Sequence, residues 1–516
     1  MSDPSPRRDL PSARRLTTGD VIAGISVALV LIPQSLAYAE LAGLPAYYGL
    51  YAAALPPLVA AFFASSRYLQ TGPVAMTALL TFGALSAFAE PFSQEWIELA
   101  ALLALVVGGA RVALGLVRGG VIAYFMSQPV LVGFTTAAAI LILSSQLPTA
   151  LGIEAEGNTI LSRAWWTLIH PGEWEGTAIV LSVITIVLVA GGRRIHRLFP
   201  GVLIAVLIGL LYSTVADYGG LVVGDVDLNL PGSPFNLPWG NFWSLIVPGA
   251  VIAMVGFAEP ASIARIFAAQ DRERWSPNKE LISQGVANLA SGLSGGFPVG
   301  GSFSRSSINR LVGGDTRWSG AVTGLAVLAF LPLAGILTDL PRAILGAIVV
   351  AAVARLIDIP NLLRFWQLSR AQALVAWFTF GATLVLSPRI DIAVVLGVGL
   401  GITVHLWREL RAPVGSAYRD GVLTVRPEGV IFFASSPDVA EAMVELLAQY
   451  PDAHRVELDL SAVGRLDLTG ALALKTLIED ARQAGLEAEI TLVPPHAQRV
   501  LDAVGEGTMA VRRPST

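Results

Sequence analysis

Apolar segments of about 20 residues recur through the first 412 residues of this 516-residue chain. A helix of that length crosses the hydrocarbon core of a bilayer, so each segment is a candidate membrane span. The candidate spans are 20–41, 47–64, 72–89, 96–117, 129–147, 176–191, 199–216, 242–260, 280–296, 303–313, 318–337, 341–357, 371–387 and 390–408. These fourteen segments, two of them short, predict an α-helical polytopic membrane protein.

Charged residues set the end of the chain apart. Residues 413–516 hold 9 Lys or Arg and 15 Asp or Glu, whereas residues 1–412 hold 25 and 23. The higher density is typical of a soluble domain, and we therefore place a boundary near Pro413, with a transmembrane domain at 1–412 and a soluble domain at 413–516. Strands are expected at 422–426, 430–434, 456–460 and 488–493, and helices at 437–449, 470–484 and 496–504. This alternation predicts a small α/β domain.

Several classes of protein are excluded by composition and motif. The chain has no Cys, so zinc thiolate sites, disulfides and a Cys nucleophile are excluded. Its formal net charge of −4 gives no sign of nucleic-acid binding. His405, His454 and His496 are too scattered to suggest a metal site. Because no phosphate-binding loop, nucleophile elbow or dinucleotide fingerprint is present, we expect neither a cofactor nor a catalytic enzyme.

Basic residues predict the orientation, because they collect on the cytoplasmic side of a membrane. Arg7, Arg8, Arg14 and Arg15 precede the first span, and the predicted outer segment 217–241 contains no Lys or Arg. Further basic residues follow spans six, eight, twelve and fourteen, namely Arg193, Arg194, Arg197, Arg272, Arg274, Lys279, Arg364, Arg370, Arg408 and Arg411. We expect a multi-pass protein of the cell (inner) membrane with both termini in the cytoplasm.

Two spans are interrupted. Residues 65–71 run into Gly72-Pro73, and residues 295–301 run into Ser302. Each reads as an extended stretch that leads into a helix, since Pro suits a first helical turn and Ser suits an N-cap. Irregular backbone at membrane depth survives only where it is buried in protein or lines a cavity. The interruptions occur at the third and tenth spans, and matched interruptions in two halves predict an inverted-repeat transporter with its site between them.

Three groups of residues carry a resemblance to a known family. The first contains Asp20, Ala23-Gly24, the run 33–39, Ala42-Gly43-Leu44-Pro45 and Gly49-Leu50-Tyr51. The second contains Asn278-Lys279-Glu280, Gly285, Asn288, the run 295–298, the run 302–306 and Asn309. The third contains Asp459-Leu460-Ser461 and Asp467-Leu468-Thr469-Gly470. In this order they resemble the two signatures of the sulfate permease (SulP) anion transporters and the loop of a STAS domain, except that Ala46 stands where a second Pro is common.

The resemblance implies more than the residues show by themselves. It implies fourteen spans in a seven-plus-seven inverted repeat, divided into core and gate subdomains, and a cytoplasmic STAS domain at 413–516. It also implies an anion substrate, a homodimer and elevator-like alternating access. Thr469 occupies a position that is a phosphorylated Ser in some relatives, and the sequence predicts it as the N-cap of a helix that starts at Gly470.

Two facing helix N-termini are the candidate anion site, because their unpaired N–H groups and dipoles attract negative charge. After Gly72, the N–H groups of Val74, Ala75 and Met76 form one end, and those of Phe303, Ser304 and Arg305 form the other. The Arg305 side chain either adds a positive charge at the anion or pairs with a carboxylate. Pro33 breaks the first span, so Gln34 and Tyr38 are expected to line the cavity, unless Gln34 only bonds the freed carbonyl.

Two carboxylates are candidates for proton coupling. Glu259, near the inner end of span eight, either binds a proton together with the anion or forms a permanent ion pair with Arg265 or Arg305. Glu40, at the outer end of span one, is the second candidate, although interfacial water is its simpler environment. We interpret Arg111 and Asp391 as structural or interfacial.

The leading hypothesis is a secondary active transporter of small anions of the sulfate, bicarbonate or dicarboxylate type. A proton would accompany the anion as symport. An uncoupled anion channel and an anion exchanger remain open, and so does a membrane-tethered signalling protein with the STAS domain as its output. Broken helices and buried charges favour transport, because a mere anchor needs one plain span.

Overall fold

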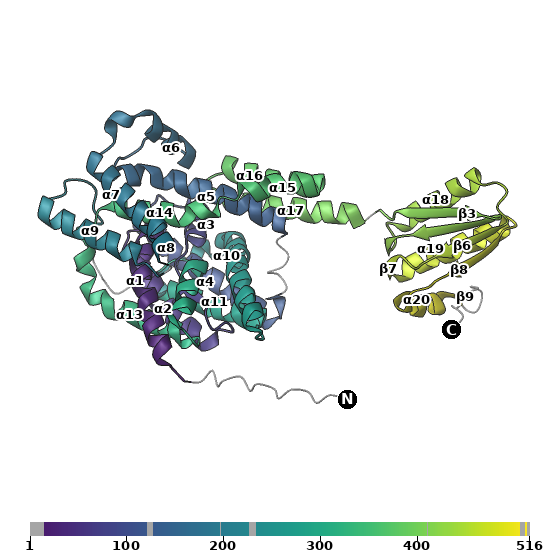
Figure 1. The fold of residues 1–516 in the computed structure, drawn as a ribbon, viewed down its shortest axis with the longest axis horizontal. Coiled ribbons are helices and arrows are strands. Elements are labelled where there is room, and N and C mark those ends of the chain that lie inside the picture. The colour runs from purple at the N-terminus through teal and green to yellow at the C-terminus, as the bar shows by residue number, and fades with distance from the viewer. Residues whose placement is uncertain are drawn as a thin grey trace. The chain divides into compact units, whose positions relative to one another are not determined.

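The computed structural model describes residues 15–120, 127–196, 198–226, 234–409, 411–505 and 511–512. Arg7, Arg8, Arg14 and Arg197, on which the orientation partly rests, lie outside these residues. The chain divides into two compact units, residues 1–399 and 400–516. The first is a bundle of helices and the second a sheet with helices (Figure 1). The last helix of the bundle continues to Glu409 and the first strand of the sheet begins at Val414.

Each of the fourteen predicted spans overlaps a helix. The helices before the sheet are α1 (Thr18–Leu41), α2 (Tyr48–Phe63), α3 (Ala75–Leu85), α4 (Gln94–Leu116), α5 (Gln128–Leu151), α6 (Ile160–Ile169), α7 (Gly176–Ile186), α8 (Gly192–Ile195), α9 (Gly201–Ala216), α10 (Phe242–Asp271), α11 (Pro277–Leu293), α12 (Phe303–Val312), α13 (Trp318–Phe330), α14 (Arg342–Val353), α15 (Ile359–Leu368), α16 (Arg370–Val385) and α17 (Ile390–Glu409). Seven helical segments of the described ranges are long and apolar enough to cross a membrane. The count of fourteen spans stays a prediction.

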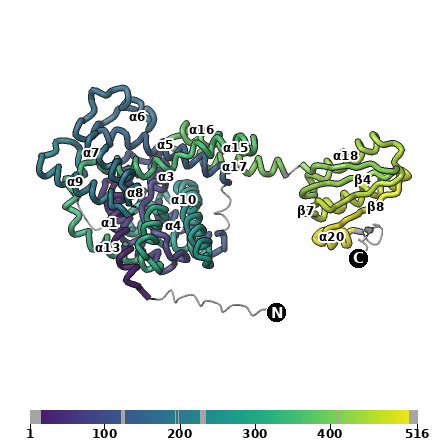
Figure 2. Tube along the Cα trace, viewed as in Figure 1, coloured from purple at the N-terminus to yellow at the C-terminus, as the bar shows by residue number. Residues whose placement is uncertain are grey.

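The helices pack in two groups. In one, α1, α2, α3 and α4 pack with α10, α11, α12 and α13; in the other, α5 and α7 pack with α14 and α16. The trace in Figure 2 follows α1 alongside α13, although the two helices are far apart in the sequence. We call the first set the core group and the second the gate group, after the predicted subdomains.

Glycines bring α4 and α11 into backbone contact. A Cβ added at Gly108 would lie 2.7 Å from the backbone nitrogen of Leu289, and one at Gly285 would lie 2.8 Å from that of Val112. A Cβ at Gly292 would lie 2.6 Å from the carbonyl oxygen of Ala101. Small residues allow such close helix packing in membrane proteins. The polar side chains of α11 are thereby held close to the middle of the helix group.

The two interrupted spans meet each other. Strand β1 (Gln70–Gly72) pairs antiparallel with β2 (Gly300–Ser302), and Thr71 is opposite Gly301. Each strand is followed at once by a helix, α3 after β1 and α12 after β2. Ser302 is the N-cap of α12, as predicted, but Pro73 precedes the N-cap Val74 and so lies outside the first turn of α3. The pairing satisfies backbone groups that would otherwise be unbonded inside the bundle.

The second unit is a five-stranded sheet in the order β3-β4-β6-β8-β9, with a separate pair β5-β7. Its elements are β3 (Val414–Arg419), β4 (Val422–Pro427), β5 (Gly429–Ile431), α18 (Ser436–Gln449), β6 (Arg455–Asp459), β7 (Val463–Leu466), α19 (Leu468–Gln483), β8 (Glu487–Thr491), α20 (Pro495–Gly505) and β9 (Val511–Arg512). The sequence missed β3, β7 and β9; the exposed positions of β3 and β7 carry little hydrophobic pattern. It also missed α6, α8 and α15 in the first unit.

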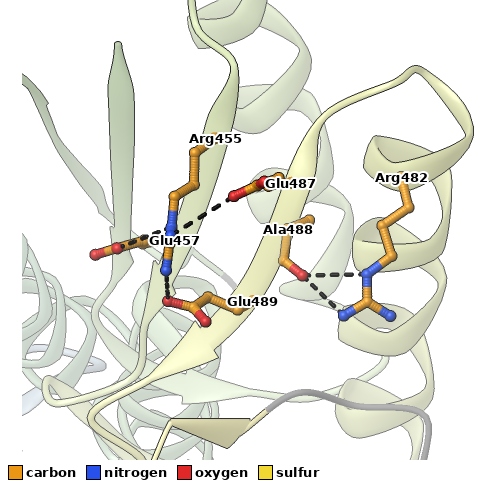
Figure 3. A network of polar contacts seen from close by, with 6 residues as sticks. All are labelled: Arg455, Glu457, Arg482, Glu487, Ala488 and Glu489. Carbon is orange, nitrogen blue, oxygen red and sulfur yellow. Dashed lines mark hydrogen bonds and ion pairs between the residues drawn. The ribbon is translucent and has the colours of Figure 1, made fainter. Parts of the chain in front are cut away.

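Polar contacts tie the strands of this sheet together (Figure 3). Arg455 on β6 pairs with Glu489 on β8 and, at 3.3 Å, with Glu457. Arg482 of α19 donates to the carbonyl oxygen of Ala488 at 2.8 Å, which fixes the end of the helix against β8. The contacts with Glu489 and Ala488 join neighbouring elements, whereas Arg455 and Glu457 are both on β6.

Asp459, at the end of β6, has a shifted pKa. Burial raises its pKa, but hydrogen bonds from Ser461 and the guanidinium of Arg426, 2.6 Å away, outweigh burial and hold the pKa below its usual range. The carboxylate therefore stabilises this unit above the ordinary pKa of an aspartate. That contribution is lost as the pH falls through the lowered value.

The predicted N-cap role of Thr469 is wrong. Helix α19 begins at Leu468, and its N-cap is Asp467, whose Oδ1 accepts from the N–H of Gly470 at 2.6 Å. The helix starts two residues earlier than expected because an aspartate that follows the strand already provides the cap.

We predict that Asp467→Ala destabilises the start of α19 by about 1 kcal/mol, because it removes the cap. Thr469→Ala should change the stability by less than about 0.5 kcal/mol. Hydrogen exchange of the peptide that covers residues 466–474 in the full-length protein measures both. Equal effects of the two substitutions would contradict the assignment of the cap.

Candidate functional site

One cavity of about 780 Å³ lies at the starts of α3 and α12. Val74, Ala75 and Met76 line it from α3, and Phe303 and Ser304 line it from α12. No side chain caps α3, whereas the Ser302 hydroxyl accepts weakly from the N–H of Arg305 at 3.5 Å. First-turn N–H groups have no acceptor within their own helix. Two helix N-termini therefore face one cavity. The first-turn N–H groups of α3 have no side-chain cap, and on α12 Glu259 faces the N–H of Phe303. Facing helix N-termini are the geometry of an anion site.

The backbone of the strands β1 and β2, which lead into α3 and α12, is closely packed. A Cβ at Gly301 would lie 2.7 Å from the Leu69 side chain and 3.1 Å from Pro260. The N–H of Gln70 donates to the hydroxyl of Ser306 at 2.9 Å, which joins β1 directly to α12. The positions of the two helix starts relative to each other are thus set by contacts within the core group.

Tyr38, predicted to line the cavity, and Glu259, the candidate for proton coupling, both lie on the cavity. The remaining wall is largely apolar and comes from the first half of α1, the start of α9, the end of α12 and the end of α14. Gln34, Gly72 and Arg305 are not among the lining residues. Gln34 and Arg305 are buried behind the wall, and Gly72 lies in the strand pair.

Arg305 is fully buried and only partly satisfied. Its Nη1 donates to Oε1 of Gln34 at 3.4 Å, while Nε and Nη2 have no hydrogen-bond partner. Among the described residues, no carboxylate pairs with it. A buried charge without a partner is costly, typically by several kcal/mol. Glu259 acts on this guanidinium electrostatically without forming an ion pair, so Nε and Nη2 remain available to a bound anion. Gln34 contacts this guanidinium instead of the cavity.

The two candidate carboxylates have different surroundings. Glu259 faces the backbone N–H of Phe303 and the charge of Arg305. Glu40 forms an ion pair with Nε of Arg342 at 2.7 Å, and its side chain is 9% exposed. Glu40 is thus bound to an arginine, and it is not among the residues that line the cavity. This arginine is on α14 and lies 302 positions later in the chain.

Arg111 and Asp391 are both held by local partners. Arg111 is fully buried and donates to the carbonyl oxygens of Ala253, Ile252 and Val299 at 3.1, 3.2 and 2.9 Å. Asp391 pairs with Arg389 at 3.0 Å. Arg111 is thus a structural residue rather than an interfacial one.

The sequence analysis also missed Gln284, although its spacing of four from Glu280 and Asn288 puts all three on one helix face.

Comparisons with known proteins agree with this arrangement. The model of the sulfate permease family matches residues 17–379, and that of the STAS domain matches residues 417–509. A probable sulfate transporter of Mycobacterium tuberculosis is 32% identical over 539 residues, covering 97% of this chain and 95% of the relative. The chain belongs to the sulfate permease family. As a member, it is a multi-pass membrane protein and an anion transporter with a C-terminal STAS domain.

Other known proteins resemble the chain over most of its length. A probable sulfate transporter 4.2 of Arabidopsis thaliana is 31% identical over 512 residues, 92% of this chain and 75% of the relative. The murine solute carrier 26 family member A9 anion transporter, solved in the inward-facing state, has a TM-score of 0.84 at 20% identity and covers 96% of this chain and 88% of its own. The transmembrane domain of a cyanobacterial bicarbonate transporter has a TM-score of 0.62 at 22% identity, over 74% of this chain and 97% of its own. The solved structures show that the permease fold is shared.

We predict that Arg305→Met weakens anion binding by about 1–3 kcal/mol, the usual value of a hydrogen bond to a charged group. Without anion, the variant should unfold at the same or a higher temperature, because a buried unpaired charge is replaced by an apolar side chain. Titration with sulfate and thermal unfolding of the purified protein measure the two effects.

Arg310→Met is the matched control. Arg310 is on the same helix but pairs with Asp271 at 2.5 Å, so its loss should lower the unfolding temperature and leave anion affinity unchanged. If Arg305→Met binds sulfate as tightly as the wild type, Arg305 is not part of the anion site.

Proposed function

We propose that this permease is a secondary active transporter of small anions, and that the anion binds between the starts of α3 and α12. The observation that carries the proposal is the cavity shared by two open helix N-termini, with the unpaired guanidinium of Arg305 behind it. Sulfate, bicarbonate and small dicarboxylates all suit this combination of N–H groups and one positive charge. The names of the relatives, sulfate and bicarbonate transporters, support these anions as the first to test.

Alternating access follows from the position of the cavity. Its apolar wall includes Phe199, Leu203, Val312 and Leu356, which lie at helix ends that the basic residues assign to the cytoplasmic side. The anion site itself belongs to the core group of helices, whereas α14 belongs to the gate group and α9 packs against α7 and α14. Movement of the core group against the gate group, elevator-like, would carry the site to the outer side without unfolding either group.

The remaining features of the proposal rest on the sequence. Residues 1–412 form the transport domain and residues 413–516 the cytoplasmic STAS domain, close to the two family matches. Both termini lie in the cytoplasm of a cell (inner) membrane protein, supported by the distribution of basic residues. The family resemblance favours a homodimer.

We assign proton coupling to Glu259. An ionised Glu259 faces the N–H of Phe303, one of the groups that the anion needs, and it also repels the anion. Protonation removes both obstacles, so that anion and proton favour each other's binding. Glu40 is bound to Arg342 outside the cavity, and we therefore do not give it this role.

The test is anion uptake by proteoliposomes with an imposed pH gradient and an internal pH dye. For Glu259→Gln, which imitates the protonated form, we expect anion binding and exchange to remain and pH-driven accumulation to be lost. The control Glu40→Gln should retain pH-driven accumulation. Uptake by the wild type without any proton signal would rule out symport and favour the exchanger or the channel. If none of the anions is moved, the proposed transport function is wrong.

A further inference from the structure

Helix α11 carries a row of polar side chains on its buried face. Glu280, Gln284, Asn288 and Ser291 follow one another at spacings of four, four and three, which places them on one side of the helix. All four are fully buried. From their contacts we infer that this row, the α11 polar row, consists of positioning residues that hold both broken helices in the geometry of the anion site. The inference deepens the proposed function and rests on it.

The first half of the row holds the chain that leads into α3. Oε2 of Glu280 accepts hydrogen bonds from the N–H groups of Ser65 at 3.1 Å and Ser66 at 2.8 Å. Nε2 of Gln284 donates to the hydroxyl of Thr71, in the middle of β1, at 2.7 Å. The extended chain before α3 is thus fixed at its entry and at its centre.

The second half of the row holds the chain that leads into α12. Oδ1 of Asn288 accepts from the N–H of Val299 at 2.9 Å, and its Nδ2 donates to the carbonyl oxygen of the same residue at 3.0 Å. The hydroxyl of Ser291 donates to the carbonyl oxygen of Phe297 at 2.6 Å. Asn288 therefore pairs with Val299 as a neighbouring strand would, immediately before β2 begins at Gly300.

A row on one rigid helix has a specific consequence. Strands β1 and β2 are only three residues long, and an isolated pair of this size is not stable by itself. Side chains from a single helix bond to both segments, so their relative position is tied to the spacing along α11. Because the N–H groups of α3 and α12 follow these segments directly, a loosened row would shift the groups that meet the anion. A site that is held loosely by its supporting residues loses affinity even when its own groups are present.

The same helix offers a matched control. Ser283 is also fully buried on α11, but its hydroxyl donates to the carbonyl oxygen of Ala60, in α2, at 3.0 Å. Ser291→Ala and Ser283→Ala delete the same atom from the same helix at the same burial. Only the first deletion touches a broken segment.

The experiment compares Asn288→Ala, Ser291→Ala and Ser283→Ala in the full-length protein reconstituted in vesicles. The KM for uptake is measured with sulfate and with bicarbonate, and hydrogen exchange is measured for the peptide covering residues 297–304. We expect Asn288→Ala to raise the KM about 10-fold and Ser291→Ala about 3-fold, because they remove two hydrogen bonds and one hydrogen bond, respectively, to the segment before α12. The KM ratio of the two anions should change, and exchange at 297–304 should become faster. Ser283→Ala should retain the wild-type KM and exchange.

These readouts separate positioning from general stability. A purely structural loss would reduce the amount of active protein and lower the maximal rate, but it would leave the KM and the ratio between the anions unchanged. Wild-type KM values for Asn288→Ala and Ser291→Ala, or equal effects of all three substitutions, would overturn the inference. If the wild type moves neither anion, the proposed function fails instead, and the exchange of residues 297–304 still decides whether the row holds that segment.

Discussion

The backbone at the two helix breaks must be hydrogen-bonded inside an apolar bundle, and the rest of the permease fold depends on this constraint. Neither broken segment can meet it alone, because an extended stretch within a membrane helix has no partner of its own. The chain solves the problem by pairing β1 with β2 and by adding side chains of α11 on one side. The helix N-termini that follow are left open toward the cavity. The same solution thus fixes the chain and places both helix starts at the cavity.

Two buried arginines of this core illustrate the difference between structure and function. Arg111 donates to three carbonyl oxygens, one of them on Val299, and so its hydrogen bonds support the segment before β2. Arg305 has one long contact with Gln34 and two unpartnered nitrogens. Both side chains are equally buried. The two residues differ in how many guanidinium nitrogens have a hydrogen-bond partner. Arg305 has two nitrogens without one, and it is therefore the arginine that can bind a further, negatively charged partner.

The contact between Glu40 and Arg342 joins the two helix groups. Glu40 is on α1, in the core group, and Arg342 begins α14, in the gate group. The cavity, by contrast, is lined by the first half of α1 and by the far end of α14. An ion pair therefore joins the two groups at one end of these helices, and the cavity lies toward the other end.

The sequence by itself determined the helices, the two breaks and the small α/β domain. Hydrophobic length, Pro and Gly at the breaks, and Ser302 as an N-cap are local properties, and local energetics decide them. It also placed Tyr38 and the helix starts near one another, because matched breaks in two halves meet at one site. It did not anticipate that Gln34 contacts Arg305 or that Gln284 holds Thr71.

Only the tertiary structure decided which polar groups are satisfied. The partners of Glu40, Gln34 and Gln284 lie more than 200 residues away in the chain, and no local pattern specifies them. The sequence predicted Thr469 as the N-cap of α19 instead of Asp467 for a related reason. Both residue types are good N-caps, and the position at which the preceding strand ends determines which of them caps the helix. A side chain's type limits the bonds it can make, but packing brings the partner within reach, and so the roles of Arg111 and Arg305 follow from their neighbours and not from their identity.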